Sequence, residues 1–158
     1  MPELESLIER LIQQQVEFVI VGGFAAVAHG VTLLTQDIDI CCRFDAENLL
    51  KLQTAIDDLH PVHRMTPQRL PLSLTTADCV GLQNLYLDTD YGQLDCLGIV
   101  LGIGDYNEVQ KQSVIIDFAG GECRVLSIDG LIKAKEAMGR TRDKQTVLQL
   151  KAIKERLK

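Results

Sequence analysis

The hydrophobic and polar positions of the N-terminal half change repeatedly between helical and strand-like spacing. Helical spacing over residues 3–15 predicts an amphipathic helix, and a β-branched apolar run at 17–21 predicts a buried strand. An alanine-rich stretch at 24–28 favours a short helix, and alternation at 37–40 predicts a second strand. Helical spacing returns over 45–59, after an aspartate suited to a helix N-cap. This half of the chain is therefore expected to alternate helices with strands.

The C-terminal half contains a different succession of patterns. Three prolines interrupt regular structure between residues 60 and 80, a segment that could either contact a substrate or only connect two elements. Apolar runs around turn residues predict hairpins at 84–98 and 113–126, with a short helix at 105–112 between them. Helical spacing over about 127–158, interrupted by glycine at 139, predicts a C-terminal helix pair. The whole pattern predicts one domain, 1–158, of the α/β (α+β) class.

Composition supports a globular protein. The chain has 158 residues, of which 46% are hydrophobic and 24% charged, without low-complexity tracts. The sequence shows neither a signal peptide at its start nor an apolar run long enough to span a membrane. Its five cysteines are odd in number and lack Cys-x-x-Cys spacing, so we expect free thiols in a reducing cytoplasm. The expected location is therefore cytoplasmic.

Charge is distributed unevenly along the chain. Residues 1–130 carry a net charge of −12, whereas residues 131–158 carry +6. An acidic body argues against an extended nucleic-acid surface, and 4% aromatic residues without tryptophan argue against a base-stacking platform. The basic tail could reach phosphate groups, or it could be a solvated helix pair whose cations suit helix C-termini.

Two adjacent glycines, Gly22 and Gly23, separate the first strand from the alanine-rich helix. Glycine allows the backbone to approach a ligand closely. A helix N-terminus presents unpaired N–H groups and a partial positive charge. The combination predicts a turn that binds phosphate.

Two carboxylates follow on the second strand. Asp37 and Asp39 are two positions apart, so they share one face, while Ile38 and Ile40 share the other. Two carboxylates on one face repel each other unless water screens them or a cation lies between them. Either a solvated strand face or a cation site accounts for the pattern.

A third carboxylate, Asp95, lies inside an apolar strand between Leu94 and Cys96. An uncompensated carboxylate there would be costly if buried, so it either faces solvent or serves the same site. The nearby Asp88 and Asp90 are expected to be turn residues, because the sequence that follows them lacks the glycine and glutamate of an EF-hand loop.

From Val21 to Asp39 the chain resembles the nucleotidyltransferase superfamily that includes DNA polymerase β, and most closely its small stand-alone members. These proteins carry a glycine pair, an acidic-apolar-acidic strand about a dozen residues later, and a third acidic residue on a later strand. The resemblance implies the nucleotidyltransferase fold, a mixed β-sheet with helices packed on one face and a C-terminal helix pair. It also implies that Asp95 is the third acidic residue. Leu33 stands where the small members usually have an arginine.

The resemblance extends to the C-terminal segment. A Leu-Ile-x-x-Lys helix followed by Gly-Arg-x-Lys-Asp is typical of the small members, and here Lys135, Arg140 and Asp143 occupy the corresponding positions. Arg142 replaces the lysine of that motif. The implied role of Lys135 and Arg140 is contact with the triphosphate or pyrophosphate, and Asp143 is expected to be a helix cap or an ion-pair partner of Arg140.

The function implied by the resemblance is transfer of a nucleoside monophosphate from a nucleoside triphosphate to a hydroxyl acceptor on a small molecule, a protein or an RNA end. Asp37, Asp39 and Asp95 would be the catalytic residues and the ligands of two Mg²⁺ ions, with Mn²⁺ as a substitute. Gly22 and Gly23 would cradle the phosphates, and Thr35 would help the nucleotide or shape the loop. The alternative is a weakly active or inactive nucleotide-binding, antitoxin-like subunit that acts through a protein partner.

Overall fold

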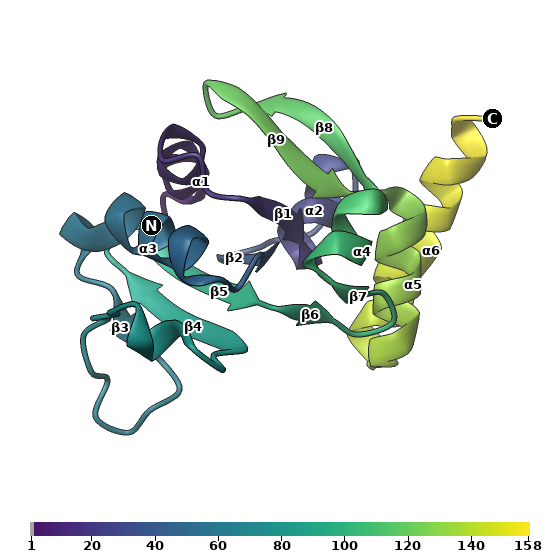
Figure 1. The fold of residues 1–158 in the computed structure, drawn as a ribbon. Coiled ribbons are helices and arrows are strands. Elements are labelled where there is room, and N and C mark those ends of the chain that lie inside the picture. The colour runs from purple at the N-terminus through teal and green to yellow at the C-terminus, as the bar shows by residue number, and fades with distance from the viewer. Residues whose placement is uncertain (1) are drawn as a thin grey trace.

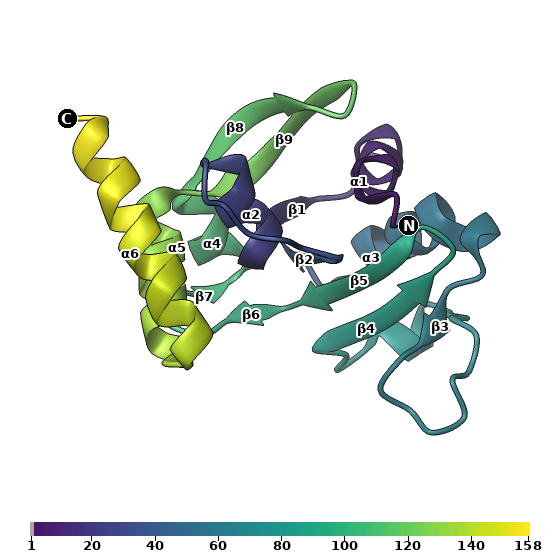
Figure 2. The ribbon, with the colours of Figure 1, turned by 180° about the vertical axis from the view of Figure 1, so that it is seen from behind.

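A computed structural model describes residues 2–158, and its centre is a mixed seven-stranded sheet (Figures 1 and 2). The strand order is β3-β4-β5-β2-β1-β9-β8. Strands β2 and β5 run parallel, as do β1 and β9, and the other neighbouring pairs are antiparallel. The bounds of the sheet strands are β1 Phe18–Val21, β2 Asp37–Cys42, β3 Val62–His63, β4 Asn84–Thr89, β5 Gly92–Leu97, β8 Ser113–Phe118 and β9 Gly121–Leu126.

The helices arise where the apolar residues recur at helical spacing. Helices α1 (Leu4–Gln13) and α3 (Ala46–Ile56) pack against each other, and both insert fully buried leucines into the core. The side chain of Asp45 accepts a hydrogen bond from the N–H of Asn48, so the expected N-cap of α3 is confirmed. The 3₁₀ turn Asp57–Leu59 ends this helical stretch.

The central unit follows the sequence pattern closely. Helix α2 (Gly22–Ala28) begins directly at the glycine pair and contacts β1, β2 and β9. The side chains of Ile38 and Ile40 on β2 are fully buried, whereas Asp37 and Asp39 on the opposite face of that strand are partly accessible. The alternation of β2 therefore separates the hydrophobic core from a polar face.

The C-terminal segment forms a helix pair at one end of the sheet, as Figures 1 and 2 show from both sides. Helix α5 (Ile128–Met138) begins at Ser127, whose hydroxyl accepts from the N–H of Gly130, and ends at Gly139 with a left-handed backbone, φ 67°. Helix α6 (Thr141–Arg156) packs along α5. The predicted C-terminal helix pair is confirmed.

A small second sheet is absent from the sequence prediction. Strands β6 (Ile99–Val100) and β7 (Gly104–Asp105) form a short antiparallel hairpin that leads into helix α4 (Tyr106–Lys111). Gly102 at its tip has φ +87°, and a Cβ there would lie 2.8 Å from the Cβ of Ala137 on α5. Only glycine therefore allows this hairpin to pack against α5.

The segment between residues 60 and 80 is irregular, as its prolines predict, but it is held by specific hydrogen bonds. The N–H of His63 donates to Leu70, and the N–H of Leu72 donates to Pro61, each at 2.8 Å. These bonds close residues 61–72 into a loop that projects from β3 and β4 (Figure 1). A 3₁₀ turn at Ala77–Cys79 precedes β4.

The five cysteines are all free thiols and all buried. Across residues 2–158, no helix combines the length and the apolar character that crossing a membrane requires.

Candidate functional site

Three carboxylates meet at the centre of the sheet. Strands β2 and β5 pair in parallel with Asp39 directly opposite Asp95, and Asp37 lies two residues earlier on β2. One oxygen from each of Asp37, Asp39 and Asp95 lies within 4.8 Å of the others. The strand register thus brings together three residues that are up to 58 positions apart in the sequence.

The electrostatics of this acidic triad (Asp37, Asp39 and Asp95) are unfavourable without a cation. Burial, with the neighbouring charges of Asp37 and Asp95, raises the pKa of Asp39 from 3.8 to about 7. Burial also raises the pKa of Asp95, although Arg64 opposes that shift. A group of hard carboxylate oxygens that repel one another is the donor set that Mg²⁺ prefers, so the residues fit a divalent cation.

The glycine pair lies beside the triad. Gly22 has φ +71°, and a Cβ built on it would lie only 2.3 Å from Oδ2 of Asp39. Any other residue would have both a strained backbone and a clash with the carboxylate. Gly22 therefore allows the start of α2 to lie directly against Asp39.

Gly23 and the residues of the following loop complete this side. A Cβ on Gly23 would lie 3.2 Å from Leu33 and 3.7 Å from the hydroxyl of Thr35. The Thr35 hydroxyl donates to the carbonyl of Asp37 at 3.0 Å, so it supports the start of β2. Leu33 is 42% exposed and places an apolar side chain over Gly23.

Lys135 and Arg140 approach the triad from the C-terminal helix pair. Both line a cavity of about 120 Å³ together with Gly22 and Asp39. The charge of Lys135 lowers the pKa of Asp39, which opposes the effect of its acidic neighbours. The remaining walls of the cavity are apolar and come from β1, β5, the β6–β7 hairpin and α5: Val21, Leu97, Val100, Leu101, Leu131, Ala134 and Met138.

Asp143 holds the side chains of Lys135 and Arg140 in place. Arg140 Nε donates to its Oδ2 at 2.6 Å, and Lys135 Nζ lies 3.6 Å from its Oδ1. The side chain of Asp143 is only 3% exposed. The expected ion pair with Arg140 is confirmed, and it holds both cations at the edge of the cavity.

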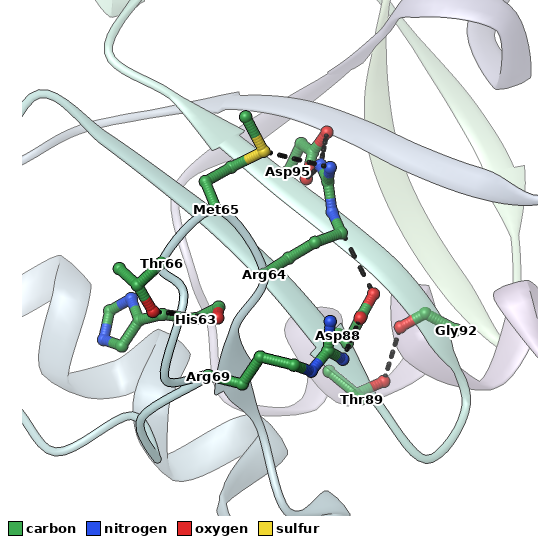
Figure 3. Close-up of polar contacts among 9 residues, drawn as sticks. All are labelled: His63, Arg64, Met65, Thr66, Arg69, Asp88, Thr89, Gly92 and Asp95. Atoms are coloured by element: carbon green, nitrogen blue, oxygen red, sulfur yellow. Dashed lines mark hydrogen bonds and ion pairs between the residues drawn. The ribbon is translucent and has the colours of Figure 1, made fainter.

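One contact of the triad was missed by the sequence analysis. Arg64, which follows β3, donates from Nη2 to both carboxylate oxygens of Asp95, at 2.6 Å to Oδ2 (Figure 3). Asp88, expected to be a turn residue, instead lies on β4 and contacts Arg69 and, at 3.9 Å, Arg64. Composition was the one signal in the sequence that could have indicated this contact, because residues 59–77 contain no acidic residue within an otherwise acidic body.

Comparison with known proteins finds solved structures of similar fold. No family model matches the chain, and no curated protein matches it significantly. Among solved structures, it is similar to the lincosamide antibiotic adenylyltransferase LnuA bound to lincomycin, with 19% identity and a TM-score of 0.63, covering 96% of each chain. It is also similar to TM1012 from Thermotoga maritima, assigned provisionally as a nucleotidyltransferase, with 20% identity, a TM-score of 0.57 and coverage of 92% and 88%.

A third similar structure is the antibiotic-resistance factor ANT(2'')-Ia, with 16% identity and a TM-score of 0.60, covering 93% of this chain and 82% of that one. All three comparisons span nearly the whole described chain. They confirm the fold expected from the resemblance: this chain has the nucleotidyltransferase fold.

Proposed function

We propose that this protein is a metal-dependent nucleotidyltransferase that moves a nucleoside monophosphate from a nucleoside triphosphate to a hydroxyl acceptor, and that residues 1–158 act as one domain. The observation that carries the proposal is the pairing of Asp39 with Asp95 across β2 and β5, with Asp37 in reach of both. A mainly structural strand has no reason to gather three carboxylates beside a helix N-terminus.

The triad would hold two Mg²⁺ ions, which neutralise charge at the α-phosphate and activate the attacking oxygen. Asp37 and Asp39 would be shared ligands, because they lie on one face of β2. Asp95 would complete the site and take up the proton of the acceptor hydroxyl. Mn²⁺ would be the natural substitute, since carboxylate oxygens also suit it.

The nucleotide side of the site is the cavity beside Gly22. Backbone N–H groups at Gly22 and Gly23 would bind phosphate oxygens. Lys135 and Arg140 would neutralise the triphosphate and then the leaving pyrophosphate, since both line this cavity with Asp39. Thr35 would keep β2 in position through its bond to Asp37.

The donor is the first unknown to measure. The similar LnuA is described as an adenylyltransferase, so ATP is the donor to try first. Thermal unfolding of the wild-type protein should be followed with each of the four nucleoside triphosphates, with and without Mg²⁺, beside Asp37→Asn and an exposed control, Asp117→Asn. A ligand at about 100-fold its Kd adds roughly 2.7 kcal/mol of stability.

We expect a Mg²⁺-dependent rise in Tm with one triphosphate, absent in Asp37→Asn and kept in Asp117→Asn. That result would identify the donor before the acceptor is known. No shift with any triphosphate would refute the proposal and favour a subunit that acts through a protein partner.

A further inference from the structure

Residues 61–72, here called the Arg64 loop, form the basic element nearest the triad outside the nucleotide cavity. The loop contains Arg64 and Arg69, and the sequence has no acidic residue between Asp58 and Asp78. Besides its internal hydrogen bonds, the loop is attached to β4, because the N–H of Arg64 donates to the carbonyl of Tyr86 at 2.8 Å. The Arg64 guanidinium also lies 5.8 Å from the centre of the Tyr86 ring.

The sheet places this loop and the nucleotide cavity on opposite sides of the triad. In the order β3-β4-β5-β2-β1, Asp39 lies on β2, Gly22 follows β1 on one side, and Arg64 follows β3 on the other. In nucleotidyl transfer the attacking and leaving oxygens lie roughly in line. If pyrophosphate leaves toward Gly22 and Lys135, the acceptor must approach from the side of Arg64.

Each carboxylate of residues 60–95 already has a partner. Asp95 is bound by Arg64, Asp88 by Arg69, Asp90 by His60 at 2.7 Å, and Asp78 by Thr75 within its own turn. A polycationic acceptor would therefore face two arginines, and every acidic side chain of residues 60–95 would already be paired.

Arg64 itself lacks a full set of partners. Its buried Nε makes no hydrogen bond and lies 3.9 Å from Oδ1 of Asp88, while Nη2 is committed to Asp95 (Figure 3). A divalent cation held by the triad would lie close to this guanidinium, and the like charges would repel. An anionic group on the acceptor side would relieve that repulsion and satisfy the guanidinium.

We propose that Arg64 is a specificity-determining residue of the acceptor site, and that the acceptor is a hydroxyl compound carrying a phosphate or carboxylate group. When the metal and nucleotide occupy the triad, Arg64 exchanges Asp95 for the anionic group of the acceptor. Arg69 remains on Asp88 and supports the loop. This inference rests on the proposed function, because that function defines the acceptor side.

The test is a binding experiment on the protein loaded with Mg²⁺ and a non-transferable ATP analogue. Binding of the analogue is measured first, because its absence would refute the proposed function and the inference with it. Equilibrium dialysis then compares three radiolabelled probes that share one ring: glucose phosphate, glucose and glucosamine. The variants are Arg64→Gln, Arg64→Lys and the control Arg156→Gln, an exposed arginine near the end of α6.

We expect glucose phosphate to bind wild type and Arg156→Gln at least tenfold more tightly than glucose or glucosamine. Arg64→Gln should lose that preference while still binding the analogue, and Arg64→Lys should keep part of it. Equal binding of glucose phosphate and glucose by the wild type, or an unchanged preference in Arg64→Gln, would overturn the inference while leaving the nucleotide site intact.

Discussion

Removing the charge of Asp39 should stabilise the metal-free protein. Burial and the nearby charges of Asp37 and Asp95 raise its pKa from 3.8 to about 7. A raised pKa in the folded state means that ionisation of Asp39 opposes folding. The cost is absent below pH 3.8, grows between pH 3.8 and 7, and is complete above that range.

The size of this effect follows from the shift. About three pKa units, at 1.36 kcal/mol each, correspond to roughly 4 kcal/mol at pH 8. Because the structure can relax around the charge, we expect Asp39→Asn to raise the free energy of unfolding by about 2–4 kcal/mol. For a domain of this size such a gain raises Tm by roughly 5–15 °C.

The assay is urea denaturation of wild type and Asp39→Asn from pH 4 to 8, in the presence of a chelator. Asp117→Asn, an exposed change on β8, is the control for a loss of negative charge alone. The advantage of Asp39→Asn should vanish toward pH 4 and should be cancelled when Mn²⁺ stabilises the wild type. A variant no more stable than wild type at pH 8 would show that Asp39 has a compensating partner, and the reasoning about the triad would be refuted.

Three further predictions concern the neighbours of the triad. Gly81→Ala should lower the free energy of unfolding by about 1–2 kcal/mol, because Gly81 has a positive φ and nothing lies within 4 Å of a Cβ there. Gly22→Ala should lower it further and should also lose Mn²⁺ binding by calorimetry, because its Cβ would in addition clash with Oδ2 of Asp39. Arg140→Gln should lower the free energy of unfolding at pH 7 by about 2 kcal/mol in urea denaturation. Because Arg140 lowers the pKa of the buried Asp143, this loss should shrink as the pH falls below 3.8, and a loss that stays constant below that pH would contradict the ion pair. Arg64→Gln should bind Mn²⁺ more tightly than wild type without nucleotide, measured by the electron paramagnetic resonance of free Mn²⁺, and weaker binding would contradict competition for Asp95.

The parts of the fold with strong local signals could be predicted from the sequence. The glycine pair after β1, the alternation of β2 and the serine N-cap of α5 each depend on residues close together in the chain. The face shared by Asp37 and Asp39 follows from strand geometry alone. Local pattern therefore predicts the common face of two of the three carboxylates of the triad.

The rest depends on register and on contacts between distant segments. That Asp95 lies opposite Asp39 requires the parallel pairing of β2 with β5, which no local pattern specifies. The ion pair of Arg64 with Asp95 joins an irregular loop to a strand 31 residues later. The β6–β7 hairpin was missed because its strands contain only two residues each, and its position depends on the close approach of Gly102 to α5.

The surroundings of Asp39 favour one of the two explanations of the Asp-x-Asp pattern. On a solvated strand face, water would screen the carboxylates and leave the pKa of each near its ordinary value. Asp39 instead lies in a cavity with Gly22 and Lys135, and its burial raises the pKa to about 7. A divalent cation with a phosphate ligand would make this charge favourable, and perturbed carboxylates in a cavity are typical of such sites. The energetic cost of Asp39 in the metal-free protein is thus itself an argument that the acidic triad is a binding site.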